Sequence, residues 1–276
     1  MNKTARSGDI NVKRVTVFAK GNVDVYDSLH SCRIGGEVCW NGINEIMRAR
    51  YEGLSVRLQH ETWTRSDALV QADGTIPAGL SQRSLNLGAY PLPSQFSDAI
   101  FNTKAEAIVL SIQPDVTNAL ERHDRMGFLL HPGEYAQWPA SDQDWLRREF
   151  GHVGKLDPVE SMANLERIIA RIRQSSSAAI LIFNLSPVIP IERIHCYQGL
   201  EDSFSTRIRR FNLALIDLSE RTGISIIDVE GVAARNGVDH IKLDVMHYTP
   251  EGYRLIAEEV VRVLDDLGVF SSEGHA

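Results

Sequence analysis

The second half of the chain alternates short apolar segments with amphipathic helical segments, and this pattern constrains the fold more than any other feature. Three runs are expected to be buried strands: Ala107 to Ile112, Ala178 to Leu185 and Ile224 to Val229. Helical patterns follow them, at residues 157–172, 206–221 and 250–267. Strands that alternate with helices are typical of βαβ units and of a parallel sheet covered on both faces. The sequence therefore predicts an α/β fold.

The helical segments carry their own start signals. Asp157 and Thr249 each precede a proline, which is the order expected of an N-cap and the first helical position. Apolar side chains then recur at helical spacing and predict the faces that pack on a core. They are Met162, Leu165, Ile169 and Ile172; Ile208, Phe211, Leu215 and Leu218; and Ile256, Val260, Val263 and Leu267.

The first half is less regular. Arg14 to Phe18 and Leu54 to Leu58 are expected to be strands, with a helix around Ile43 to Tyr51 between them. Residues 73–97 are rich in Gly, Pro, Ser and Asn, which favours a long irregular connection followed by a short helical piece near residues 96–101. Residues 118–157 show no clear period, so they fit a lid, the wall of a pocket or a plain surface insertion.

Length and composition favour one domain. The chain has 276 residues with no repeat and no convincing internal boundary. We expect a single three-layer α/β/α domain with a mostly parallel sheet and flavodoxin-like layering over residues 13–270. Residues 1–12 are expected to be a loose lead-in and residues 271–276 a tail.

Charge and cysteine content exclude several functional classes. The net charge of −7 gives no electrostatic case for nucleic acid or an anionic membrane. The odd number of cysteines, 3, fits reduced thiols better than a disulfide framework. No apolar run is long enough to span a bilayer and the N-terminus has no apolar signal core, so a cytoplasmic location is expected.

The stretch from Leu243 to Val263 carries the strongest candidate for chemistry. Asp244 and His247 lie three residues apart, just before the last helix. A histidine with a nearby carboxylate can act as a general base whose ring the carboxylate orients. In a parallel sheet, ligands bind at the carboxyl ends of the strands, where this stretch is expected to lie.

The C-terminal hundred residues resemble an SGNH/GDSL hydrolase. The resemblance rests on the strand AAILIFNLSPV, the helix RIRRFNLALIDLSERTG, the strand ISIIDV, the D-x-x-H motif and T-P-E-G-Y at the next helix. In that family the final block supplies the catalytic Asp and His, so the resemblance implies these roles for Asp244 and His247. It is clear in the C-terminal half and holds only in outline in the N-terminal half.

The family's first block, G-D-S-L directly after the first strand, allows two alignments here. In one, Asp27-Ser28-Leu29 matches D-S-L, and Ser28 is the nucleophile. In the other, Gly21-Asn22-Val23 occupies the block, and Val23 stands where the serine should be. Residue identity favours the first alignment and distance from the strand favours the second; we predict Ser28.

The oxyanion-binding residues of the family are not at their expected positions. Its third block, G-x-N-D, corresponds to Ile112-Gln113-Pro114-Asp115, so Gln113 or Asn118 could replace the Asn. Gly88 is a candidate for the second-block glycine. Losing one oxyanion donor costs roughly a hundredfold or more in rate, which lowers the expectation of ordinary esterase activity.

Two functions follow from these observations. The first is a serine hydrolase that cleaves an ester of a small polar molecule or a carbohydrate through Ser28, His247 and Asp244, or passes the acyl group to an acceptor hydroxyl. The second is a degenerate SGNH-like domain that binds a ligand or partner without acyl transfer. Neither requires a metal or an organic cofactor, and the oligomeric state is left open.

Overall fold

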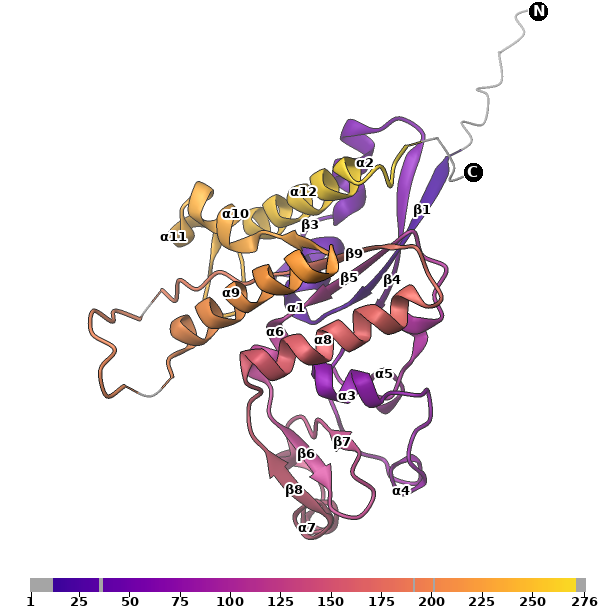
Figure 1. The fold of residues 1–276 in the computed structure, drawn as a ribbon, viewed down its shortest axis with the longest axis vertical. Coiled ribbons are helices and arrows are strands. Elements are labelled where there is room, and N and C mark those ends of the chain that lie inside the picture. The colour runs from indigo at the N-terminus through magenta and orange to yellow at the C-terminus, as the bar shows by residue number, and fades with distance from the viewer. Residues whose placement is uncertain (1–11, 35–36, 191, 201, 272–276) are drawn as a thin grey trace, which may run out of the picture.

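A five-stranded parallel sheet organises the computed structural model, with the strands in the order β10-β9-β5-β1-β4 (Figure 1). The structure describes residues 12–34, 37–190, 192–200 and 202–271. The strands of the sheet are β1 (Lys13–Lys20), β4 (Leu54–Glu61), β5 (Ala107–Ser111), β9 (Ala179–Phe183) and β10 (Ser225–Ile227). The chain thus places β4 on one side of β1 and then crosses to place β5 on the other.

Helices cover both faces of this sheet. One face shares an apolar core with α1 (Val23–Leu29), α2 (Ile43–Arg50), α10 (Val229–Asn236) and α12 (Pro250–Asp266). The other face shares a core with α3 (Ser66–Gln71), α8 (Pro158–Arg173) and α9 (Phe204–Thr222). Figure 1 shows α12 and α2 above the sheet and α8 and α9 across its other side. The predicted three-layer α/β/α class is confirmed.

Short elements complete the fold. They are β2 (Cys32–Ile34), β3 (Glu37–Trp40), α4 (Ala78–Ser81), α5 (Leu92–Gln95), η1 (Ala99–Phe101), α6 (Gln113–Thr117), β6 (Leu120–His123), β7 (Leu129–Leu130), η2 (Tyr135–Gln137), α7 (Ala140–Glu149), β8 (Phe150–Val153) and α11 (Val238–Ile241). The three cysteines are free thiols. In the described part of the chain, no helix combines the length and the apolar character needed to span a bilayer.

The long helices form where their local signals predict them. The side chain of Asp157 accepts a hydrogen bond from the Val159 N–H, and that of Thr249 accepts one from Gly252, so both act as N-caps. All four apolar positions predicted for α8 are buried, and so are the four predicted for α9. In α12 the prediction was wrong for Leu267, which is 47% exposed, because the helix ends at Asp266 and Leu267 is its C-cap.

Residues 118–157 contain an antiparallel sheet that the sequence did not predict. Its strands lie in the order β7-β6-β8, and α7 packs against them around a small separate core that includes Trp145 and Phe150. The strands are only two to four residues long, which is too short for a recognisable period. The region is therefore a folded insertion, seen at the bottom of Figure 1. The expected lead-in and tail lie almost wholly outside the described residues, so that division stays a prediction.

Candidate functional site

The strand order places a topological switch point between the carboxyl ends of β1 and β5. The connections from these two strands diverge there, which is where ligands bind in open parallel sheets. Asn22 follows β1 and Gln113 follows β5, and the Asn22 amide donates to Oε1 of Gln113 at 3.0 Å. The two segments that correspond to the first and third family blocks are thus in direct contact.

A glycine allows α1 to begin immediately after β1. A Cβ on Gly21 would lie 2.4 Å from a methyl of Val25, so only glycine permits this close approach of strand and helix. As a result Val23 is the first residue of α1, and Ser28 lies more than one turn further along. The spatial start of the helix therefore agrees with the alignment that places Val23 in the serine position.

Ser28 points into the protein interior. Its side chain is 0% exposed, and its hydroxyl donates to the backbone carbonyl of Asp24 at 2.6 Å. A nucleophile has to meet both its base and the substrate carbonyl, and this geometry offers neither to the Ser28 hydroxyl. The assignment of Ser28 as nucleophile stays a prediction that the observed arrangement does not favour.

Asp244 and His247 form a contact in a tight turn. Nδ1 of His247 lies 2.8 Å from Oδ2 of Asp244, and Oδ1 of Asp244 accepts the backbone N–H groups of Met246 and His247. Partial burial opposes ionisation of Asp244, but these hydrogen bonds and the His247 ring lower its pKa. About half of each side chain is exposed, so Nε2 of His247 is open to a ligand or water.

Two features hold this turn in place. A Cβ on Gly252, in the first turn of α12, would lie 2.5 Å from the Ile241 carbonyl oxygen, so glycine lets the preceding loop pack on the helix. Lys242 is 4% exposed, and its ammonium donates to the carbonyls of Ser186 and Val188 at 2.8 Å each. The loop after β9 is thereby fixed to the loop that carries the Asp-His pair. Burial lowers the pKa of Lys242 to about 8.

Asp27 of α1 interacts electrostatically with His247. Asp27 follows Val23 by four residues and therefore lies on the same face of the helix. Burial raises the pKa of Asp27, while the Tyr253 hydroxyl and the charge of His247 oppose that rise. Sequence reasoning missed Asp27 as a site residue; its spacing from Val23 was the available signal.

Two of the candidate oxyanion donors, Gln113 and Asn118, have hydrogen-bond partners within the protein. The Gln113 amide nitrogen donates to the Thr117 hydroxyl at 2.8 Å, while its oxygen accepts from Asn22. The Asn118 amide donates to the Thr64 carbonyl at 2.9 Å, and its oxygen accepts from Thr117. Each of these amides thus has one N–H and its oxygen engaged by the protein.

A buried carboxyl group lies beneath this network. Asp24 is 3% exposed and accepts from the Ser111 hydroxyl, which in turn accepts the backbone N–H of Gln113. Burial raises the pKa of Asp24 despite these hydrogen bonds. The sequence analysis did not single out Asp24. Its role in the structure is to join α1 to the end of β5.

Gly88 makes no hydrogen bond with Asn22, Gln113 or Asn118, but the nearby residue Tyr90 does. Gly88 is exposed, with φ +57°, and its N–H donates to the Asn86 side chain. Two residues later, Tyr90 is hydrogen bonded by the side chains of Asn118 and Asn22, although burial raises its pKa overall. Tyr90 lies in the irregular segment 73–97, where no periodic pattern could have identified it.

The Tyr90 ring is supported by His131 from the inserted region. The two ring centroids lie 4.3 Å apart, and Gln95 bonds the backbone of both residues. Burial lowers the pKa of His131 to about 4, so its ring is neutral at pH 7. The insertion therefore supports the segment that carries Tyr90.

This arrangement predicts an acid-sensitive contact. In the unfolded chain His131 titrates near 6.5, so below that pH the unfolded state binds more protons than the native state, and stability falls as the pH falls toward 4. Titration of His60 also lowers the stability as the pH falls, whereas that of Asp115, whose pKa burial raises to about 6, increases it.

Urea unfolding of wild type and His131→Gln between pH 7 and 4.5 isolates the contribution of His131. We expect the slope of the wild type to exceed that of the variant by up to about 1.4 kcal/mol per pH unit. Equal slopes would show that the His131 ring is not held neutral.

Comparison with known proteins gives similarity only at the level of structure. No protein-family model matches the sequence, and the search of curated proteins found no match. An alpha/beta hydrolase enzyme from the metagenome of Lake Arreo, Spain, has 14% identity and a TM-score of 0.50, covering 94% of this chain and 97% of that one. An acetylxylan esterase from Geobacillus stearothermophilus has 12% identity and a TM-score of 0.49, covering 92% and 95%. A member of the lipolytic G-D-S-L family from Veillonella parvula has 13% identity and a TM-score of 0.45, covering 91% and 98%.

These likenesses concern the fold. The chain has the α/β/α architecture of the Lake Arreo hydrolase over nearly its whole length. The layered α/β/α fold that the C-terminal motifs implied is confirmed. The protein is thus a three-layer α/β/α domain with an Asp-His pair in the loop before its last helix.

Proposed function

We propose that the protein is an SGNH-fold domain that binds a small polar ligand, an ester or a carbohydrate, at the carboxyl edge of its sheet without forming an acyl-enzyme. The observation that carries the proposal is the direction of the Ser28 side chain: the hydroxyl bonds within α1 and is fully buried. Acyl transfer to an acceptor needs the same nucleophile as hydrolysis, so the proposal excludes both reactions through Ser28.

The remaining polar groups support recognition of a neutral ligand. Several hydrogen-bonding side chains follow the strands next to the switch point of the sheet, where binding sites form. They are those of His247, Asp244, Tyr90, Asn22 and Gln113. Because the amides bond one another, a ligand has to replace those contacts or use the free lone pairs of their oxygens. Such a site favours hydroxyl-rich or ester-bearing molecules over strongly charged ones.

A fluorophosphonate probe tests this directly, because it labels an activated serine covalently. Wild-type protein and Ser28→Ala are incubated with the probe, and their intact masses are measured by mass spectrometry. An esterase with an exposed serine is the positive control. We expect no adduct on either protein. An adduct on the wild type that disappears in Ser28→Ala would restore the serine-hydrolase mechanism and overturn the proposal.

One observation favours a second function. The Asp244–His247 contact has the geometry of a general base with its orienting carboxylate, and Nε2 of His247 is accessible. His247 could activate water directly on a small ester, without a covalent intermediate. Turnover of p-nitrophenyl acetate that requires His247 and Asp244 but survives Ser28→Ala distinguishes this reaction from simple binding.

A further inference from the structure

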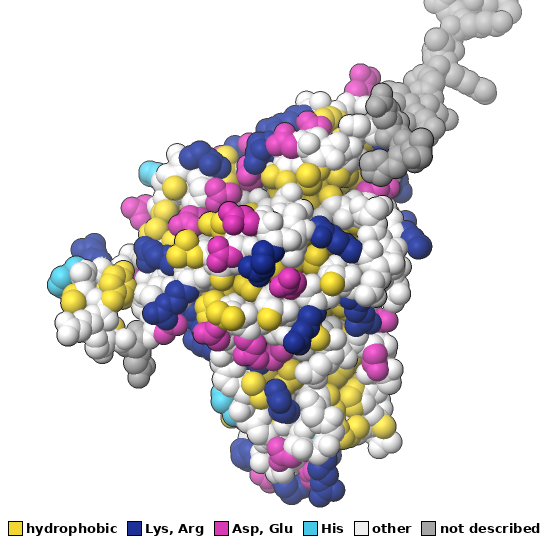
Figure 2. Space-filling model, in the orientation of Figure 1, with side chains coloured by type: hydrophobic (Ala, Val, Ile, Leu, Met, Phe, Trp, Pro, Cys, Tyr) yellow, Lys and Arg dark blue, Asp and Glu magenta, His cyan; other side chains and the backbone are white. Residues whose placement is uncertain are grey.

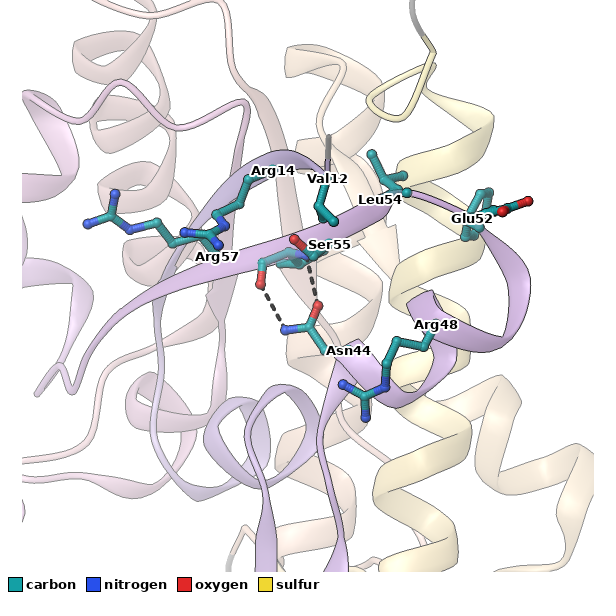
Figure 3. Close-up of a pocket in the computed structure, with 11 residues that line it drawn as sticks. Val12, Arg14, Asn44, Arg48, Glu52, Leu54, Ser55 and Arg57 are labelled. Atoms are coloured by element: carbon teal, nitrogen blue, oxygen red, sulfur yellow. Dashed lines mark hydrogen bonds between the residues drawn. The ribbon is translucent and has the colours of Figure 1, made fainter. Parts of the chain in front are cut away.

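A pocket on the described surface lies away from the candidate site. It has a volume of about 690 Å³ and lies at the amino-terminal ends of β1 and β4 beside α2 (Figure 3). Because both strands run parallel, this position is at the edge of the sheet opposite Asn22 and His247. Whatever this cavity binds is therefore independent of the function proposed above.

Three arginines line the cavity: Arg14, Arg48 and Arg57. All three are exposed, and none makes a hydrogen bond or an ion pair with any described residue. Elsewhere in the described chain many arginines pair with carboxylates, including the neighbouring Arg50 with Glu258 at 3.5 Å. A group of unpaired cations is unexpected on a protein with a net charge of −7.

The strand register brings two of these arginines together. Arg14 lies opposite Ser55 and Arg57 opposite Thr16, so the two arginines are diagonal neighbours on one face of the sheet. Figure 3 shows both guanidinium groups extending in the same direction from the two strands. Like charges on neighbouring strands repel each other. An anion placed between them would remove that cost.

Among the described residues, no carboxylate pairs with Arg14 or Arg57. Glu52 lies on the rim and forms no ion pair, and Glu106 accepts the Thr16 backbone N–H rather than either guanidinium. On the other side of β4, the Asn44 side chain bonds both the N–H and the C=O of Val56 at 2.8 Å. Asn44 thus bonds the backbone of β4 and positions α2, which also carries Arg48.

We propose that this cavity binds an anion of the phosphate or sulfate type carried by a small molecule, with Arg14 and Arg57 as the principal ligands and Arg48 at the far side. Guanidinium groups suit such anions because their planar N–H donors match tetrahedral oxyanions in pairs. The volume leaves room for more than a bare phosphate group. The rest of the ligand can therefore contact Tyr51 and Ser55, which also line the cavity.

Isothermal titration with inorganic pyrophosphate, at ionic strength held constant with sodium chloride, tests the site. We expect saturable binding to the wild type. In Arg14→Gln and in Arg57→Gln we expect the affinity to fall by about tenfold or more, since each substitution removes charge-assisted hydrogen bonds. Arg209→Gln, at an exposed arginine on α9 outside the cavity, is the matched control and should bind as the wild type does.

The outcomes separate the alternatives. Equal affinity in wild type and both cavity variants, or equal weakening in Arg209→Gln, overturns the proposal in favour of non-specific binding.

Discussion

Replacing Asp67 by alanine is expected to destabilise the protein by about 3–5 kcal/mol, which is the usual cost of leaving a buried charge without its partner. The arginine it pairs with, Arg65, is 0% exposed, and Asp67 accepts two hydrogen bonds from it, at 2.9 and 2.7 Å. Arg65 also donates to the carbonyls of Gly154 and Asn118. These contacts hold the insertion against the carboxyl edge of the sheet.

The matched control is a pair with the same chemistry in solvent. Glu251 also accepts two hydrogen bonds from an arginine, Arg254, but more than a third of each side chain is exposed. We expect Glu251→Ala to cost less than about 1 kcal/mol, because solvent screens the pair. Urea unfolding at pH 7 measures both. Similar losses for the two variants would show that burial of Arg65 does not decide the energy of its pair.

Placing a serine at position 23 is expected to create a labelling site that the wild type lacks. Val23 is the first residue of α1, and it shares a helix face with Asp27, on whose carboxyl group the charge of His247 acts. A hydroxyl there would meet a general base whose ring Asp244 already orients. We expect Val23→Ser to gain at least tenfold more fluorophosphonate adduct than the wild type, at a slow rate because no free oxyanion donor is in place.

Two variants control this experiment. Val23→Ala has the smaller side chain without the hydroxyl and should stay unlabelled. The double variant Val23→Ser with His247→Ala keeps the hydroxyl but loses the base and should also stay unlabelled. If Val23→Ser folds and gives no adduct, position 23 does not face His247, and the correspondence with the family's serine position is wrong.

The sequence predicted the sheet and its long helices because their signals are local. Five buried residues, four of them apolar, mark β5, and an Asp or Thr followed by Pro starts α8 and α12. The insertion escaped prediction for the opposite reason. Its strands are very short, and its core depends on aromatic residues such as Trp145 and Phe150, which meet only after the chain has folded.

The candidate site divides in the same way. The contact between Asp244 and His247 could be predicted because three residues of one turn bring the two side chains together. The first block was ambiguous, since Ser28 matched by identity and Val23 by distance from the strand. Identity of residues with a family motif carries no information on which side of a helix a residue lies.

By itself, therefore, the sequence determined the layered α/β architecture, the caps of its helices and the Asp-His pair, because each depends on neighbours within a few residues. Only the tertiary structure decided that Ser28 faces the core, that Asn22 meets both Gln113 and Tyr90, and that Arg14 and Arg57 share a face. The physical reason is that side-chain direction and cross-strand register depend on packing between distant segments, which no local pattern encodes.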